Sequence, residues 1–175
     1  LQQTTVATVI PRFTRFTARW PTIAALAAAR DAEILAEWAG LGYYARARNM
    51  IACARSVVAM GGFPRTAKEL RQLPGLGDYS AAAIAAIGFG ERVAVVDGNV
   101  DRVIARLIGL NQPVAKAKPL IRQLMLSITP ATRPGDLAQA IMDLSQSHCR
   151  ARKPLCTLCP LQRHCVAGHS DDPAA

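Results

Sequence analysis

The sequence has no apolar run long enough to cross a membrane. Its apolar runs are interrupted by charged residues or glycine well before about 18 residues, the length at which a transmembrane helix becomes a candidate. No signal-peptide pattern opens the chain. Hydrophobic residues nevertheless make up 51% of the 175 positions, which is enough for a folded core and too much for a disordered tail.

Acidic residues and lysines are also scarce. The chain has 12 Asp and Glu against 21 Lys and Arg, of which only 4 are Lys, so its formal net charge is +9. A charge this positive favours a polyanionic partner, and nucleic acid is the commonest one. The alternative is a protein with a basic bias and no such partner, and the charge alone leaves both open.

Few segments alternate with a period of two, whereas helix-like apolar spacing recurs throughout, so we predict an all-α fold with no internal repeat. The length fits one domain or two small ones that share a cleft. The β-branched run Val93–Val96 is a possible extended segment. The expected helices are Leu1 to about Trp20 with a break or kink at Pro11, Pro21 to about Arg30, Ala32–Ala39 capped by Asp31, about Tyr43–Met60, Ala67–Gln72 capped by Thr66, Asp78–Phe89, Val100–Leu110, Lys116–Ser127 and Arg133–His148.

The chain opens on Leu1 inside a helix-periodic segment, with no capping residue or turn before it. We interpret the sequence as a fragment whose N-terminal part is missing.

The segment Leu73-Pro-Gly-Leu-Gly77, between two expected helices, predicts a helix–hairpin–helix. Gly75 and Gly77 are expected to adopt positive φ and to leave their N–H groups exposed. With the N-terminus of the following helix, these amides would bind an anionic oxygen such as a DNA phosphate. The alternative is an ordinary turn between helices, and the charge of Asp78 would weaken a phosphate contact.

Four of the five cysteines lie in the last 27 residues, with the spacing C-x6-C-x2-C-x5-C at Cys149, Cys156, Cys159 and Cys165. Four thiolates this close in sequence can surround one metal centre. A zinc site more often uses two separated C-x2-C pairs, so the spacing favours a [4Fe–4S] cluster. Two disulfides are the alternative for a secreted protein. Cys53 is expected to be a buried free thiol.

Asp97 follows an apolar run and precedes an expected helix, which is the ordinary position of an N-cap. It also comes about twenty residues after the hairpin that would hold DNA. A carboxylate there could stabilise an oxocarbenium-like sugar while a base departs, as carboxylates do in glycoside hydrolysis. Both roles remain open from the residues alone.

The segments Leu73-Pro-Gly-Leu-Gly-Asp-Tyr-Ser-Ala and Val96-Asp-Gly-Asn-Val-Asp-Arg-Val, with the cysteine loop, resemble the helix–hairpin–helix DNA glycosylases that carry an iron–sulfur cluster, the relatives of endonuclease III. The segments Leu1-Gln-Gln-Thr and Gly40-Leu-Gly-Tyr-Tyr-Ala-Arg-Ala-Arg-Asn49 are similar to the adenine glycosylases of the MutY type. The resemblance covers nearly the whole chain.

This resemblance implies a two-lobed fold, with a six-helix module at 1–91 that contains the hairpin at about 66–89 and a cluster module at 92–175 with its loop at 149–165. It implies removal of adenine mispaired with 8-oxoguanine or guanine, by flipping the adenine out of the duplex. The implied partner is double-stranded DNA bound by a monomer, and the implied location is the cytoplasm of a bacterium.

The resemblance also assigns the functional residues. Asp97 matches the catalytic aspartate, Tyr79 a pocket residue beside the flipped nucleotide, and Asn99 a polar neighbour of the aspartate. Gln3 and Tyr43 match residues that wedge into the duplex, and Arg102 and Arg106 match basic residues near the cluster. The residues that we assign to DNA binding are Gln3, Tyr43, Gly75, Gly77, Arg102 and Arg106.

Position 79 bears on the reaction type. The related glycosylase/lyases carry a Lys there, which attacks the sugar and forms a Schiff base. A tyrosine cannot form that imine, and no Lys lies between Lys68 and Lys116. The sequence therefore predicts a monofunctional, hydrolytic glycosylase.

Two parts of the family pattern fall outside residues 1–175. The general acid, a Glu, stands three residues before the position of Leu1, and a C-terminal domain that helps to recognise 8-oxoguanine follows the cluster. We therefore expect little or no activity from these residues alone. The alternatives are a thymine or uracil mismatch glycosylase of the same superfamily, in which Tyr79 also occurs, and a non-catalytic iron–sulfur module that binds DNA.

Overall fold

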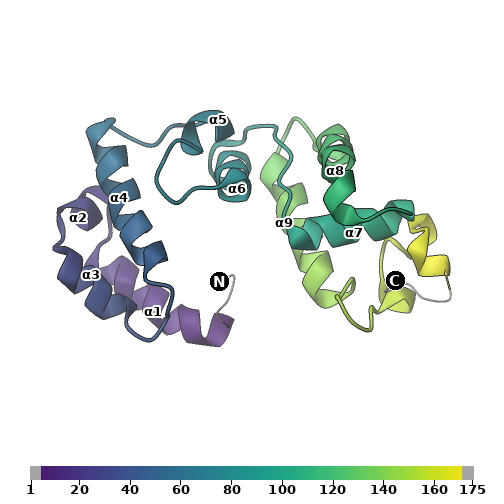
Figure 1. The fold of residues 1–175 in the computed structure, drawn as a ribbon, viewed down its shortest axis with the longest axis horizontal. Helices are drawn as coiled ribbons and strands as arrows, with labels where there is room; N and C mark the ends of the chain where they lie inside the picture. Colours follow the sequence, from purple (N-terminus) through teal and green to yellow (C-terminus); the bar gives the residue numbers. More distant parts are fainter. Residues whose placement is uncertain (1–4, 171–175) are drawn as a thin grey trace. The chain divides into compact units, whose positions relative to one another are not determined.

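The fold is all-helical in a computed structural model that describes residues 5–170, and this confirms the predicted class. Figure 1 shows the helices in chain order. No helix among these residues is long and apolar enough to span a membrane. The α-helices are α1 Val6–Arg19, α2 Ile23–Ala28, α3 Asp31–Trp38, α4 Ala45–Ala59, α5 Ala67–Leu70, α6 Asp78–Phe89, α7 Gly98–Ile108, α8 Val114–Ile128 and α9 Pro134–Ser147, followed by the 3-10 turns η1 Cys156–Leu158, η2 Gln162–His164 and η3 Ala167–His169.

Helix α1 continues through Pro11, so a break there is wrong, whereas a kink stays a prediction. A second local expectation is also wrong. Asp31 is the first residue of α3 rather than its cap, because Arg30 occupies the N-cap position without a side-chain hydrogen bond. The run Val93–Val96 lies in the connection between α6 and α7 and forms no strand with another described segment, and its extended conformation stays a prediction.

The chain divides into two compact units, one of Leu1–Pro64 with Lys68–Gly77 and one of Arg65–Ala67 with Asp78–Ala175. The division into a six-helix module at 1–91 and a cluster module at 92–175, which the family resemblance implies, stays a prediction.

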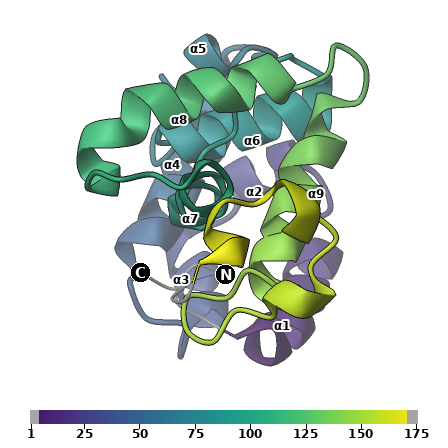
Figure 2. The ribbon, with the colours of Figure 1, turned by 90° about the vertical axis from the view of Figure 1, so that its right-hand side faces the viewer.

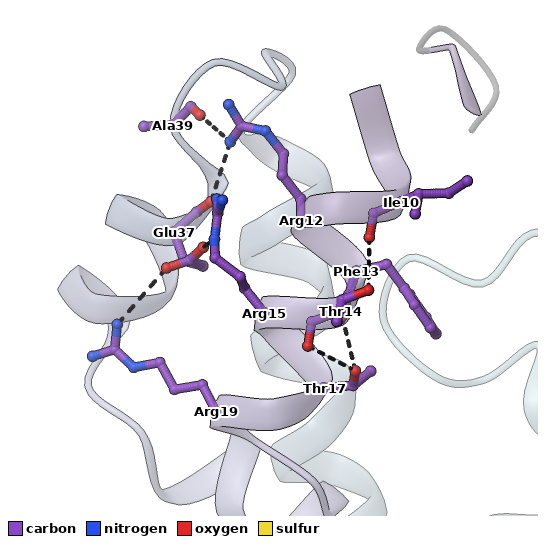
Figure 3. Close-up of polar contacts among 9 residues, drawn as sticks. All are labelled: Ile10, Arg12, Phe13, Thr14, Arg15, Thr17, Arg19, Glu37 and Ala39. Atoms are coloured by element: carbon purple, nitrogen blue, oxygen red, sulfur yellow. Dashed lines mark hydrogen bonds and ion pairs between the residues drawn. The ribbon is translucent and has the colours of Figure 1, made fainter. Parts of the chain in front are cut away.

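The first unit packs α2 and α3 against α4. The inward face of α4 carries the small and β-branched side chains Ala47, Ile51, Ala54 and Val57, all fully or almost fully buried. Figure 3 shows how α1 is tied to α3: Arg12 donates to the carbonyls of Glu37 and Ala39 at the α3 C-terminus, and Arg15 and Arg19 pair with the Glu37 carboxylate.

The second unit is built around α7, which packs against α8, α9 and the turn η3. Figure 2 shows α8 crossing over α7, with the C-terminal turns beside it. The core holds Val100, Ile104, Ile121 and Met125. Burying side chains of this size stabilises the fold by roughly 1.5–3 kcal/mol each. This core fixes the N-terminus of α7.

Helices α6 and α9 cross at very close range in this unit. A Cβ atom added to Gly135 would lie 2.7 Å from the Cα of Ile87 and 2.9 Å from the carbonyl oxygen of Ala86. Both of those atoms belong to the backbone of α6, so only glycine fits at position 135. The small residues Ala82, Ala86 and Ala138 fill the rest of the contact.

Candidate active site

Asp97 is the N-cap of α7. Its Oδ1 accepts hydrogen bonds from the backbone N–H groups of Asn99 and Val100, both at 2.9 Å, and its Oδ2 accepts from the Asn99 side chain at 3.0 Å. The capping role considered for Asp97 is therefore confirmed. It does not conflict with a catalytic one, because the same bonds hold a half-buried carboxylate in one orientation at the positive end of a helix dipole.

Tyr79 lies in the first turn of α6, in the same unit as Asp97. Its hydroxyl donates to Met142 Sδ at 3.5 Å, and the half-buried ring packs on the α6–α9 contact. Burial and, to a smaller extent, the negative charge of Asp97 raise the pKa of the Tyr79 phenol. The phenol is thus neutral at physiological pH.

The side chains of Asn99 and Arg102 connect Asp97 to the cysteine loop. Arg102 Nη2 donates to Asn99 Oδ1 at 3.1 Å and to the Ser145 carbonyl at 3.1 Å, while its Nε donates to the Cys149 carbonyl at 2.9 Å. Asn99 is thus a polar neighbour of Asp97, as predicted, and Arg102 connects Asn99 to the backbone of Cys149, the first cysteine of the loop.

Arg106 lies one turn further along α7 and is 8% exposed. Its guanidinium donates to the carbonyls of Arg150 at 2.7 Å and Ala151 at 3.2 Å, and approaches Cys149 Sγ at 3.6 Å. The structure therefore directs Arg102 and Arg106 at the backbone of the cysteine loop. Their assignment to DNA binding stays a prediction.

All four C-terminal cysteines line one cavity, together with Arg106 and His148. Burial raises the pKa of the Cys156 thiol, and the charges of the other three thiolates add to the rise. Four thiols that repel one another when ionised form a soft donor set of the kind that a metal centre neutralises. Among the described residues, however, no three His, Cys, Asp or Glu side chains stand in the geometry of a closed metal site.

None of the five cysteines forms a disulfide. The remaining thiol, Cys53, is half-buried on α4, and burial raises its pKa.

The hairpin is a tight turn. The Leu76 N–H donates to the Leu73 carbonyl at 3.2 Å, and Gly75 has φ +79°. Proline at the second position and a positive-φ glycine at the third are the features of a type II turn. A Cβ atom on Gly75 would lie 2.6 Å from Asn49 Cβ. The prediction of positive φ is confirmed for Gly75 and wrong for Gly77.

Tyr43 has an unusual backbone conformation, which no pattern in the sequence predicts. Its φ is +46°, in the left-handed region that non-glycine residues seldom adopt, and its side chain is 64% exposed. The loop before it is fixed by Trp38, whose indole N–H donates to the Gly42 carbonyl, and by Arg46, whose guanidinium lies over both the Trp38 and Tyr43 rings. Gln3 lies outside the described residues.

Comparison with known proteins identifies the family. Residues 1–130 match the model of the HhH-GPD superfamily of base excision DNA repair proteins. The chain belongs to this superfamily.

Its similar relatives include several adenine DNA glycosylases. The human protein is 45% identical over 172 residues, which are 95% of this chain and 32% of that protein. The protein of Buchnera aphidicola subsp. Acyrthosiphon pisum (strain APS) is 37% identical over 95% of this chain and 49% of its own length. The chain thus spans about a third to a half of these relatives. The superfamily and the MutY-type relatives inferred from the motifs are confirmed.

Solved structures of other DNA repair proteins share the fold. A thermostable thymine-DNA glycosylase superimposes with a TM-score of 0.84 at 30% identity, covering 95% of this chain and 78% of that one. A non-covalent endonuclease III–DNA complex gives a TM-score of 0.77 at 26% identity, with the same coverage. The all-helical fold of the HhH-GPD glycosylases is therefore established for this chain.

Proposed function

We propose that the chain is the catalytic part of a monofunctional glycosylase that hydrolyses the N-glycosidic bond of adenine mispaired with 8-oxoguanine or guanine in double-stranded DNA. The observation that carries this proposal is the carboxylate of Asp97, oriented by three hydrogen bonds at the α7 N-terminus, in a unit where position 79 is a neutral phenol. The 45% identity to the human adenine DNA glycosylase supports adenine as the base.

The carboxylate of Asp97 acts on the sugar. As the N-glycosidic bond breaks, its electron pair leaves with the adenine, which takes up a proton, and the sugar becomes cationic. The negative charge of Asp97 stabilises this cation. Water then adds to the anomeric carbon and loses a proton, so the products are free adenine and an abasic site.

Tyr79 limits the reaction to hydrolysis. Cleavage of the DNA strand by β-elimination requires an amine that condenses with the opened sugar, and the phenol provides none. Its hydroxyl is engaged with Met142 and its pKa is raised, so it acts as a neutral wall of the site. The expected product keeps an intact phosphodiester backbone.

Sequence-independent contacts to the phosphates would hold the DNA. The Gly75 turn would offer backbone amides to a phosphate, and the exposed Tyr43 would wedge into the duplex. We expect Gln3, Gly77, Arg102 and Arg106 to contribute, and we expect the protein to bind as a monomer. Binding should weaken steeply with salt, because phosphate contacts release counterions.

The four cysteines that line the cavity would hold a [4Fe–4S] cluster, and the donor set fits one. When bound, the cluster supplies a covalent clamp for the C-terminal loops. Arg106 holds the Arg150 and Ala151 carbonyls of the loop between the first and second cysteines, so the chain itself orders that part of the site.

The likeness to the thermostable thymine-DNA glycosylase supports a second candidate, the removal of thymine or uracil from mismatches with guanine. Single-turnover excision on duplexes that contain adenine opposite 8-oxoguanine, adenine opposite guanine, or thymine or uracil opposite guanine separates the two. Release of adenine alone supports the proposal. Release of thymine or uracil alone overturns it, and release of no base from any duplex leaves a DNA-binding module.

The excision test requires two forms of the protein. One is residues 1–175, and the other joins them to an N-terminal segment that carries the family's general-acid Glu. Departure of adenine needs a proton as well as charge stabilisation at the sugar. We expect residues 1–175 to bind the duplex and to excise slowly, and the joined form to excise efficiently. Equal rates would show that another group supplies the proton.

A further inference from the structure

The side-chain oxygen of Asn99 accepts two hydrogen bonds from different helices. Arg102 Nη2, on α7, donates at 3.1 Å, and Gln146 Nε2, on α9, donates at 3.4 Å. A guanidinium has only donors, so the oxygen of the Asn99 amide must face Arg102 and Gln146. The NH₂ group of Asn99 then faces Asp97 Oδ2, to which it donates at 3.0 Å.

The orientation of Gln146 is itself determined. Its Nε2 lies 3.4 Å from Ser145 Oγ as well as from Asn99 Oδ1. The Ser145 hydroxyl gives its hydrogen to the Met142 carbonyl at 2.6 Å, so its oxygen can only accept from Gln146. Ser145 is 1% exposed and keeps this arrangement fixed in the protein. The NH₂ group of Gln146, and not its oxygen, therefore faces Asn99.

We propose that Gln146 is a positioning residue, which orients the Asp97 carboxylate through the side-chain amide of Asn99. The proposal rests on the proposed function, in which Asp97 stabilises the cationic sugar. Gln146 is separated from Asn99 by 47 positions and comes from α9, so it ties the α7 N-terminus to the neighbouring helix. Arg102, in contrast, lies on α7 itself, three residues after Asn99.

The variant Gln146→Glu tests the donor directly. It keeps the shape of the side chain and replaces the NH₂ group by an acceptor oxygen, which would face the oxygen of Asn99. We expect the single-turnover excision rate to fall about tenfold, the effect of one lost hydrogen bond of ordinary strength. The variant Gln146→Lys restores an N–H donor and should restore most of the rate. Gln123→Glu, the same charge change on the exposed surface of α8, is the matched control and should excise like the wild type.

A double-mutant cycle shows whether Gln146 acts through Asn99. In an Asn99→Ala background, Gln146→Glu should cause no further loss of rate, because the residue that it orients is gone. A wild-type rate for Gln146→Glu, or the same tenfold loss in both backgrounds, would overturn the inference. Failure of Gln146→Lys to recover activity would also overturn it, since a merely structural contact does not distinguish donors in this way.

Failure of the inference about Gln146 can be distinguished from failure of the proposed glycosylase function. If the wild type releases no base, that failure is seen before any variant is compared. The side-chain NH₂ resonances of Asn99, assigned with Asn99→Ala in ¹⁵N-labelled protein, then carry the test. Gln146→Glu should shift them and Gln123→Glu should not. Unmoved resonances in Gln146→Glu would contradict the inference.

Discussion

Asn99 holds both oxygens of the Asp97 carboxylate: its backbone N–H donates to Oδ1 at 2.9 Å and its side chain donates to Oδ2 at 3.0 Å. Asn99 is thus the neighbour that contacts both oxygens, and the Val100 N–H adds a second bond to Oδ1. Asp97 also caps α7, so in the proposed mechanism one position of the carboxylate would serve both the cap and the sugar.

Replacement of Asp97 by Asn should separate charge from capping. Asn caps a helix as well as Asp does, so the thermal midpoint and the affinity for DNA should change little. The excision rate should fall by about 10²–10³, because the cationic sugar loses its counter-charge. As a comparison, Asp97→Ala should also lose about 0.5–2 kcal/mol of stability. Full activity of Asp97→Asn would reduce Asp97 to a helix cap.

Replacement of Tyr79 by Lys should introduce lyase chemistry. Borohydride should trap no covalent adduct between wild-type protein and DNA, whereas Tyr79→Lys places an amine at the position of the phenol and should form a reducible imine. Tyr79→Phe is the control that removes the hydroxyl without adding an amine, and it should trap nothing. An efficient adduct with the wild type would contradict the hydrolytic mechanism.

Replacement of Gly75 by Val should weaken DNA binding. The turn requires a positive φ, and a Cβ atom would lie 2.6 Å from Asn49 Cβ, so the backbone must shift away from its present shape. We expect an increase in the dissociation constant of at least about tenfold and a shallower salt dependence. Gly88→Ala on α6 meets no other atom within 4 Å and serves as the control. Normal binding by Gly75→Val would make the hairpin a structural turn only.

Replacement of Cys159 by Ser should remove the metal centre. Wild-type protein should show the broad absorbance near about 400 nm that is typical of [4Fe–4S] centres, and Cys159→Ser should lose both the absorbance and the iron. The loops after residue 149 should then become sensitive to proteases, because they have little core of their own. Cys53→Ser should keep the full iron content. About one zinc and no iron per wild-type chain would exclude the cluster.

Burial makes Asp101 a source of pH-dependent instability. It is 8% exposed, its Oδ1 has no hydrogen-bond partner, and burial raises its pKa, with Asp97 adding to the rise and Lys118 and Arg122 opposing it. The folded state therefore holds the proton more tightly than the unfolded state. The protonated Asp101 carboxyl therefore contributes stability below the ordinary pKa of aspartate. This contribution is lost as the pH rises through the raised pKa of Asp101 in the folded state.

The variant Asp101→Asn should remove that loss. Its thermal midpoint should exceed that of the wild type near neutral pH, and the difference should shrink toward about pH 4, near the ordinary pKa of aspartate. Thermal unfolding followed by circular dichroism across this range measures it. A difference that is independent of pH would show that the charge of Asp101 is not the cause.

The sequence predicts the helices well where local signals agree. Helix α6 begins and ends at the predicted residues, because Asp78 follows the Pro-Gly turn and Gly90 follows its last residue. The prediction of Asp31 as an N-cap is wrong because an acidic residue is favourable both at the cap and in the first turn of a helix. The positive φ of Tyr43 has no local signal, since packing of Trp38 and Arg46 on the loop imposes it.

The sequence predicts which residues belong to the candidate site, but it does not predict the hydrogen bonds that connect them. The spacing of Asn99 and Arg102 places both on the first turns of α7, but their link to Cys149 spans 47 positions and depends on how α9 ends. Gln146 carried no signal in the sequence, because a polar residue on a helix surface is unremarkable until its partner is known. Likewise, nothing local shows that the two donors on Asn99 converge from two helices.

The contact at Gly135 has a consequence for the proposed base site. Tyr79 and Met142 stand on α6 and α9, the two helices whose backbones touch at Gly135. The Tyr79 hydroxyl contacts Met142 Sδ at 3.5 Å, so the separation of these two side chains depends on how closely the backbones of α6 and α9 approach each other at Gly135. A methyl group at position 135 would push the two helices apart and weaken the contact between Tyr79 and Met142. We therefore expect substrate range in this chain to respond to position 135, with every side chain that contacts the base unchanged.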